Sequence, residues 1–427
     1  MEHFNPDQKI LLSAEYLFDV KNFSEFETLF SYLPSILEKN QNTGRQKTPF
    51  LSCLKCLIYM STAGVKNLSE LRRALLNNPS LCFKCGFDPS HLPPIERFSS
   101  FLKDTPHTFF KRIEAELVRK LMDYGIVSGK YLTIDASPVP IQCRENNLKT
   151  SVRDRFNKLY PPKADPEASL GVMVNYLKPF HKKVTYFWGY KNHILSDPIS
   201  ELPLFELTKP ANVSEGTLLI PMIKKLKERL EIFPQAVLAD AGYDYESNLK
   251  FIIHQLKARP VIARNLRWEK HKEHKLSRKG TPICIAGLEM IYWGRFSDRG
   301  RVRLKYVCPI THSKRYREKY YFCPWNHPKF TKGKGCYVYL RGDDTVRNSI
   351  DYGSREFKRL YKFRTASERI ISRLSCLGIQ SPSVRGFTAV SNWCSTVHIS
   401  LLLIALTAYR TDNKEQIRFV KNFLPNL

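Results

Sequence analysis

The chain has 427 residues, of which 43% are hydrophobic, so it is long enough for two or three domains with sizeable cores and is not a disordered protein. Lys and Arg number 68 against 40 Asp and Glu, and the net charge of +28 indicates a polyanionic partner, of which nucleic acid is the simplest. Residues 399–408, the most apolar C-terminal stretch, fall short of the ~20 residues that a membrane span needs. The polar first residues lack a signal-peptide core, so we expect a cytoplasmic protein with no membrane contact.

Residues 1–128 are predicted to form a helical N-terminal domain. Apolar residues recur at helical spacing over 49–63, 68–78, 94–104 and 107–125. Such a domain could recognise DNA ends or could serve only as a scaffold, because a helical pattern alone does not show function.

Residues 129–263 are predicted to form the first part of a mixed α/β core. "KYLTIDASPVP" reads as a strand that carries Asp135, and a basic, Pro-rich loop is expected over 143–180. The following pattern is typical of a mixed sheet: strands over 183–197 and 202–212, a helix over 214–230, a strand over 235–240, a helix over 245–258 and a strand over 259–263.

The stretch "QAVLADAGYD" (235–244) ends a short apolar run at Asp240 and places a second acid, Asp244, four residues later. An acid at the end of a buried strand can cap a helix or bind a metal ion at the rim of the sheet. We expect Asp244 to cap the following helix and Asp240 to be the metal ligand.

Residues 264–345 are predicted to be a basic, β-rich insertion. Residues 251–340 hold 21 Lys and Arg against 5 Asp and Glu, a net charge of +16. Aromatic residues are interleaved with these charges, which suits phosphate contacts and base stacking, although a solvated basic face is the alternative. The aromatic residues are Trp268, Trp293, Tyr306, Tyr320, Tyr321 and Trp325.

Residues 346–427 are predicted to complete the core with a helix over 354–378 and an apolar helix over about 387–410. The first of these helices carries Glu368. Asp135, Asp240 and Glu368, from two strands and a helix, can converge at one edge of a mixed sheet. Three carboxylates there would bind two Mg²⁺ or Mn²⁺ ions and support phosphoryl transfer.

The sequence resembles the DDE transposases of bacterial insertion sequences, which have an RNase H-like core. The resemblance spans roughly residues 130–410. Four stretches carry it: "TIDAS" with Asp135, "GYKNH" (189–193), "ADAGYD" with Asp240, and "YKFRTASERIISRL" (361–374), in which Tyr361, Arg364 and Glu368 match the tyrosine–arginine–glutamate signature of one branch.

The resemblance implies that Asp135, Asp240 and Glu368 form the catalytic, metal-binding triad and that Tyr361 and Arg364 orient DNA near the scissile phosphate. The activity would be metal-dependent cleavage and strand transfer at the ends of the chain's own insertion sequence. The implied partners are the terminal inverted repeats and target DNA, held by a homodimer in a synaptic complex at the nucleoid.

Ser375 departs from the family, which often has Lys seven residues after the Glu. Arg373 is a nearby candidate for DNA binding, although five positions after Glu368 it faces another side of the helix. In "GYKNH" Lys191 and His193 would lie on the strand face opposite Asn192, and one of the two faces could point into the active cleft.

Two alternatives remain open at this point. Ser375 favours an inactive or domesticated DNA-binding protein derived from a transposase, and a nuclease with the same core would hydrolyse DNA without joining it. Structural zinc is a minor interpretation of the cysteines, since buried Cys often serves as a small hydrophobe and the second set fits no standard zinc spacing. The two sets are Cys53, Cys56, Cys82 and Cys85, and Cys284, Cys308, Cys323 and Cys336 with His312 and His327.

Overall fold

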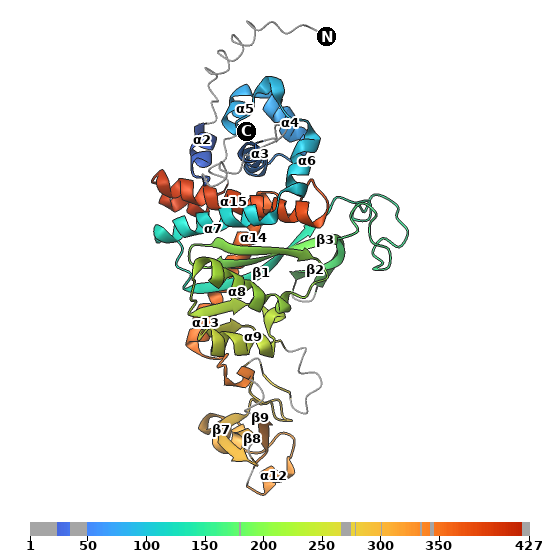
Figure 1. Ribbon diagram of the computed structural model, residues 1–427. Helices are drawn as coiled ribbons and strands as arrows, with labels where there is room; N and C mark the ends of the chain where they lie inside the picture. Colours follow the sequence, from blue (N-terminus) through green and yellow to red (C-terminus); the bar gives the residue numbers. More distant parts are fainter. Residues whose placement is uncertain are drawn as a thin grey trace.

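The computed structural model describes residues 24–34, 49–178, 181–265, 275–277, 279–299, 301–333, 335–341 and 346–420. In Figure 1 a layer of helices lies at one end, a mixed sheet lies in the middle, and a small second sheet lies at the opposite end.

The central sheet has six strands within the described residues, in the order β2-β3-β1-β5-β6, and β4 pairs with the second half of β3. β1 runs antiparallel to β3 and parallel to β5, which runs parallel to β6. The predicted α/β fold with an RNase H-like mixed sheet is therefore confirmed. The strands are β1 Tyr131–Pro140, β2 Ser169–Lys178, β3 His181–Asp197, β4 Leu202–Pro210, β5 Ala236–Ala239 and β6 Arg259–Ile262.

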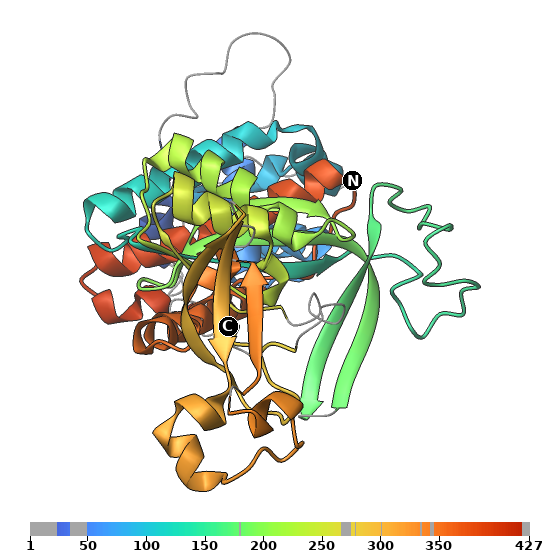
Figure 2. The same ribbon diagram turned by 90° about the horizontal axis from the view of Figure 1, so that it is seen from below.

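β2 lies inside the segment 143–180 that was predicted to be a loop, so that prediction is wrong for residues 169–178. β2 pairs antiparallel with the first half of β3. Val172 and Val174 of β2 and Val184 and Tyr186 of β3 are exposed, and Figure 2 shows the hairpin extending from the body as a long arm.

The N-terminal helices pack on α15 (Phe387–Arg410), whose central residues are buried. Along α15 lie α7, α6, α3 and β4, so one helix joins the N-terminal layer to the sheet. Asn67 caps α4 by accepting a hydrogen bond from Glu70 N at 2.9 Å. The helices of this part are α2 Ser24–Ser31, α3 Phe50–Thr62, α4 Leu68–Asn77, α5 Pro79–Cys85, α6 Ile95–Asp104 and α7 His107–Asp123.

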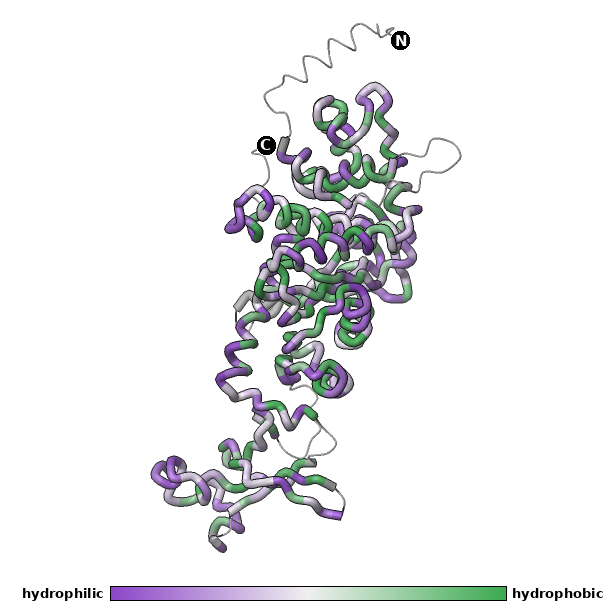
Figure 3. The backbone as a smooth tube through the Cα atoms, turned by 60° about the vertical axis from the view of Figure 1, so that its left-hand side comes forward, coloured by the Kyte–Doolittle hydropathy of each residue, from purple (hydrophilic) through white to green (hydrophobic). Residues whose placement is uncertain are grey.

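Among the described helices, α15 has the length and apolar composition of a membrane span. Its apolar window is, however, completely buried inside the protein. Figure 3 shows the same arrangement, with hydrophobic segments running through the body of the molecule and hydrophilic turns at the outer end of the insertion.

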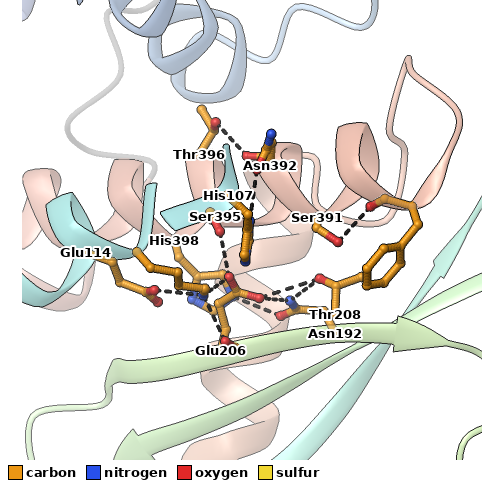
Figure 4. A network of polar contacts seen from close by, with 12 residues as sticks. His107, Glu114, Asn192, Glu206, Thr208, Ser391, Asn392, Ser395, Thr396 and His398 are labelled. Atoms are coloured by element: carbon orange, nitrogen blue, oxygen red, sulfur yellow. Dashed lines mark hydrogen bonds and ion pairs between the residues drawn. The ribbon is translucent and has the colours of Figure 1, made fainter. Parts of the chain in front are cut away.

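A buried polar network fastens α7 and α15 to the sheet (Figure 4). Lys111 of α7 forms ion pairs with Glu114 and with Glu206 of β4, and all three side chains are buried. Ser395 of α15 donates to Glu206 Oε1 at 2.6 Å, and Asn192 of β3 donates to Glu206 Oε2 at 2.5 Å. Each buried charge thus has an ionic or hydrogen-bonded partner, as burial requires.

The insertion forms its own antiparallel sheet, in the order β7-β8-β9. None of its described residues belongs to the main hydrophobic core, and it projects from the end of the molecule opposite the N-terminal helices (Figure 1). Trp268 lies outside the described residues. The elements are β7 Ile291–Asp298, β8 Arg301–Val307, α10 Pro309–His312, α11 Lys314–Lys319, α12 Pro328–Thr331 and β9 Tyr337–Arg341.

Two predicted helices are divided in the structure. The segment 354–378 consists of α13 (Arg355–Tyr361), a 3₁₀ turn over Lys362–Arg364, and α14 (Thr365–Cys376). The segment 245–258 consists of α9 (Glu246–Lys250) and a π-helical turn over Phe251–Gln255. The helix predicted over 214–230 is α8 (Leu219–Leu230), preceded by a 3₁₀ turn over Glu215–Thr217.

Candidate active site

Asp135 and Asp240 lie at the same edge of the central sheet. β1 and β5 are parallel, and their last paired residues are Thr133 and Leu238. Each acid comes two residues after the last β1–β5 pair, so the parallel register places both carboxylates side by side where β5 ends, although β1 itself continues along β3 to Pro140. This juxtaposition follows from the sheet order alone.

Both carboxylates are costly to ionise where they lie. Burial, together with the charges of Asp240 and Glu215, raises the pKa of Asp135 to about 6 against the hydrogen bonds from Ala136 N and Ser367. Burial and Glu215 also raise the pKa of Asp240, against the N–H of Gly242 and the charge of Arg364. A buried group of like charges favours a bound cation or proton.

Asp244, predicted to be a helix cap, has another role. Asp240 is the residue that caps the short 3₁₀ turn, since its Oδ1 accepts from Gly242 N at 2.8 Å. Asp244 is buried, accepts from Asn265 N at 2.7 Å and pairs with Arg347 at 2.9 Å. The cap prediction was wrong because Asp244 ties the core to the segment after the insertion.

Glu368 reaches this edge on α14. Ser367 Oγ donates to Asp135 Oδ2 at 2.9 Å, which fixes the start of α14 beside β1. Glu368 follows Ser367 directly, and its side chain is 58% exposed and forms an ion pair with Arg364. The helix is therefore anchored at the sheet edge, whereas the Glu368 carboxylate faces solvent.

Arg364 links the three acids electrostatically. Its guanidinium pairs with Glu368, and the charges of Glu368 and Asp135 raise its pKa. The same guanidinium opposes the rise in the pKa of Asp240. One cationic side chain thus lies within electrostatic reach of all three predicted triad residues.

Tyr361 lies beside Arg364 at the end of α13. Its ring stacks on Phe357 with centroids 5.9 Å apart and an angle of 9°, and the Arg364 guanidinium lies 5.9 Å from the Tyr361 centroid. Burial raises the pKa of the Tyr361 hydroxyl, which Asp240 and Glu368 also influence. The structure therefore places Tyr361 and Arg364 together at the acidic edge.

Glu215 is a site residue that the sequence reasoning missed. It lies in the 3₁₀ turn after β4, and its charge raises the pKa values of Asp135 and Asp240. Lys191 of β3 forms an ion pair with Glu215 at 2.5 Å and opposes the rise in the pKa of Asp240. The sequence signal that could have indicated Glu215 was its position as an acid shortly after the end of a predicted strand.

Two of the predicted DNA-binding residues lie away from an accessible surface. His193 is on the β3 face opposite Asn192, as expected, but its side chain is fully buried, so it is not placed to contact DNA directly. Arg373 is 15% exposed and paired with Glu201, on a side of α14 away from Asp135. Burial therefore keeps His193 from direct DNA contact in this structure, and a DNA contact by Arg373 would have to replace its ion pair with Glu201.

The donors at this edge fit a hard divalent cation. Carboxylate oxygens are the preferred ligands of Mg²⁺ and Mn²⁺, and burial raises the pKa values of Asp135 and Asp240, so a bound cation or proton would favour this arrangement. In the described part of the chain, no three His, Cys, Asp or Glu side chains already surround a common ion position. Glu368 would have to turn from Arg364 toward the two aspartates to complete one.

The fold and the site together define an α/β protein with a mixed sheet and an acidic cluster formed by Asp135 of β1, Asp240 just after β5 and Glu368 on α14. The family described as "Transposase DDE domain" matches residues 134–403, which include all three acids. The chain belongs to this transposase family. A search of curated proteins gives no match.

The solved structures similar to this chain include "Cryo-EM structure of piggyBac transposase synaptic complex with hairpin DNA (SNHP)". The two chains are 13% identical, with a TM-score of 0.37, over 97% of this chain and 78% of the other.

Proposed function

We propose that the protein is the transposase of an insertion sequence and that it cleaves DNA at the ends of its element and joins those ends to target DNA. The observation that supports this most strongly is the convergence of Asp135, Asp240 and the Glu368 helix on one sheet edge, with Arg364 in electrostatic reach of all three. Membership of the transposase DDE family supports the same activity.

Asp135, Asp240 and Glu368 would hold two Mg²⁺ or Mn²⁺ ions. When bound, such ions activate the attacking oxygen and stabilise the leaving oxygen of an in-line phosphoryl transfer. Ser367 keeps the Asp135 carboxylate oriented, and the Gly242 N–H does the same for Asp240. Glu215, paired with Lys191, adds negative charge at the edge of the site.

Tyr361 and Arg364 are proposed to orient the scissile phosphate. A guanidinium fork matches two phosphate oxygens. In the structure this fork is bonded to Glu368, so DNA binding would exchange that carboxylate for a phosphate. The exchange would release Glu368 for metal binding at the moment when the substrate arrives.

The proposed partners are the terminal inverted repeats of the element and a target DNA, held by a homodimer. The chain's charge of +28 favours DNA at any sequence. The exposed basic residues of the insertion, with exposed Trp293, Tyr321 and Trp325, are suited to phosphate and base contacts. The helical N-terminal domain is a second candidate for end recognition.

The experiment uses labelled DNA that carries the element's own end, with Mg²⁺ or Mn²⁺, and compares the wild type with Asp240→Ala. We expect metal-dependent nicking at the element boundary and strand-transfer products, both lost in the variant while DNA binding persists. Glu228→Ala, an exposed acid on α8, is the matched control and should behave as the wild type.

Cleavage by Asp240→Ala at the wild-type rate would contradict the proposed site. Cleavage without joining would identify a nuclease. DNA binding without cleavage by the wild type, under conditions in which a related active enzyme cuts, would instead favour a non-catalytic DNA-binding protein. Ser375, in place of the usual Lys, is the residue that favours this last alternative. Among the described contacts, its hydroxyl donates only to the Ile371 carbonyl of its own helix, at 2.8 Å.

A further inference from the structure

Three cysteines far apart in the sequence meet at one end of the insertion sheet. Cys308 directly follows β8 and Cys336 directly precedes β9, and the register pairs Val307 with Tyr337. The strand pairing therefore places Cys308 and Cys336 next to each other. Gly335 packs against Cys308 so closely that a Cβ on this glycine would lie 2.6 Å from the Cys308 Cβ.

Cys284 joins them from a tight turn that leads into β7. Ile283 and Glu289 form a β-bridge on either side of the turn, and Cys284 N donates to Leu288 O at 2.9 Å. Ile291, at the start of β7, pairs with Val307 of β8. The turn thus lies at the same end of the sheet as Cys308 and Cys336.

The Cys336 thiol contacts each of the other two thiols. Cys336 lies at the centre and is within hydrogen-bond distance of both Cys284 and Cys308. Backbone N–H groups also point at the outer two sulfurs: those of Leu288 and Ala286 at Cys284, and those of Thr311 and Ile310 at Cys308.

We propose that Cys284, Cys308 and Cys336 bind one structural zinc ion as thiolates, leaving one position of a tetrahedral ion for a fourth ligand. The thiols are arranged as a chain through Cys336, not yet around a common point. Binding requires rotation of these side chains about their Cα–Cβ bonds and release of the thiol protons to solvent.

The insertion has a physical need for such an ion. Its described residues add nothing to the main hydrophobic core, and many of their aromatic side chains are exposed, including Tyr292, Trp293 and Phe296 of β7. Small modules with little buried apolar surface are commonly held together by a metal or by disulfides. In a chain with reduced thiols, zinc is the suitable cross-link, since thiolate ligands select it over Mg²⁺ or Ca²⁺.

The second cysteine set provides a contrast within the same molecule. Cys53 and Cys56 on α3 face Cys82 and Cys85 on α5, and all four are fully buried in the main core. Burial raises the pKa values of Cys53 and Cys82 to about 12, and the Cys82 thiol donates to Phe87 O at 3.5 Å. This set behaves as neutral thiols that fill apolar space.

The test is the metal content of the full-length protein, expressed with zinc in the medium and dialysed, by inductively coupled plasma mass spectrometry. We expect about one zinc ion per chain in the wild type, and close to none in Cys336→Ser. Cys376→Ser, an exposed cysteine at the end of α14, and Cys56→Ser, in the buried set, should keep the zinc. Absence of zinc from the wild type, or its retention by Cys336→Ser, would overturn the proposal.

A second measurement needs no variant that might misfold. Titration of the zinc-depleted wild type with Co²⁺ should produce the strong near-ultraviolet absorption of thiolate-to-metal charge transfer, and zinc should then abolish it. Asp135, Asp240 and Glu368 offer only oxygen ligands and cannot give this band. Weak visible absorption without the charge-transfer band would show that Co²⁺ binds oxygen ligands only, and would contradict the three-cysteine site.

Discussion

Asp135 is held in its ionised form at a cost to the metal-free fold. Its folded-state pKa of about 6 lies above the ordinary value of 3.8, because of burial and the nearby acids. This loss of folding stability is absent at pH values below the ordinary pKa of 3.8 and reaches its full size above about pH 6. Removing this charge should therefore stabilise the protein when no cation is present.

We predict that Asp135→Asn raises the free energy of unfolding in EDTA at pH 8 by on the order of 2 kcal/mol. Added Mn²⁺ should raise the melting temperature of the wild type but not that of the variant. Differential scanning calorimetry measures both effects. Asp123→Asn, an exposed acid on α7, should show neither stabilisation nor loss of the metal response; an unchanged or lowered stability of Asp135→Asn would count against the electrostatic account.

His193 gives the protein a pH dependence of the opposite kind. Its side chain is buried without a hydrogen-bond partner for either ring nitrogen among the described residues, and burial lowers its pKa to about 4. The unfolded chain takes up this proton near the ordinary value of 6.5. The contribution of neutral His193 to folding stability is therefore complete above pH 6.5 and is lost as the pH falls toward 4.

Replacement of His193 by Leu should abolish this loss. Between pH 7 and pH 5 the wild type should lose about 2 kcal/mol more stability than His193→Leu, as measured by urea unfolding at each pH. His254→Leu, an exposed histidine, should leave the wild-type pH dependence unchanged. Parallel curves for the wild type and His193→Leu would show that His193 is protonated in the folded protein.

Asp240 was predictable from the sequence as an acid just after a buried strand, whereas Asp135 lies in the middle of β1, which continues to Pro140, and not near the strand end as expected. Glu215 was not predictable in the same way, since it lies on a short turn whose position depends on β3 and β4. The pairing of Arg364 with Glu368 follows from their spacing on a helix, but its closeness to Asp135 depends on the Ser367 contact.

At the scale of elements, α7, α15 and β4 share one buried ionic network. Lys111 supplies the positive charge near both Glu114 and Glu206. Although burial opposes ionisation, Lys111 and the neighbouring histidines hold the pKa of Glu206 at about 2. These contacts align the N-terminal layer with the strand next to β3, which in turn pairs with the Asp135 strand.

Lys111→Met should destabilise the protein by about 3–5 kcal/mol at pH 7, because it leaves buried carboxylates without a cation. Adding Glu206→Gln to this variant should recover part of the loss. Chemical denaturation measures both changes, and Arg112→Met, exposed on the same helix, is the control. A loss below about 1 kcal/mol would show that water or protonation already compensates the buried acids.

The helices α3, α4, α6 and α7 and the strands β1 and β3 to β6 were predictable because their apolar residues have clear helical or strand periodicity, whereas the short helices α2 and α5 were not predicted. β2 was missed because a basic, Pro-rich segment precedes it and because Val172 and Val174 face solvent. The break between α13 and α14 was missed because neither proline nor glycine marks it in the sequence.

At the scale of the whole molecule, the insertion is rich in Lys and Arg and lies at the end of the molecule opposite the N-terminal helices (Figure 1). Its charge was evident from composition, whereas the meeting of Cys284, Cys308 and Cys336 depends on strand register that spacing does not reveal. If the insertion contacts DNA, its lysines and arginines should account for part of the salt dependence of binding.

Replacing Lys314, Arg315 and Arg317 of α11 by Gln should reduce the slope of log K against log[salt] by up to about 3. Fluorescence anisotropy over a series of KCl concentrations measures this slope. Lys224, Lys225 and Lys227 on α8, changed in the same way, control for net charge and should have a smaller effect. Equal reductions in both variants would indicate that the insertion makes no particular DNA contact.

The central claim is that β1, β5 and α14 together build one cation site, and its most direct test is metal-directed cleavage of the protein itself. Fe²⁺ would replace Mg²⁺, ascorbate and peroxide would generate hydroxyl radicals at the bound ion, and mass spectrometry would map the backbone cuts. We predict cuts near Asp135, Asp240 and Glu368 in the wild type that disappear in Asp240→Ala, while any cuts near Cys308 persist. Cuts that are absent from these three segments, or that are unchanged in the variant, would contradict the account.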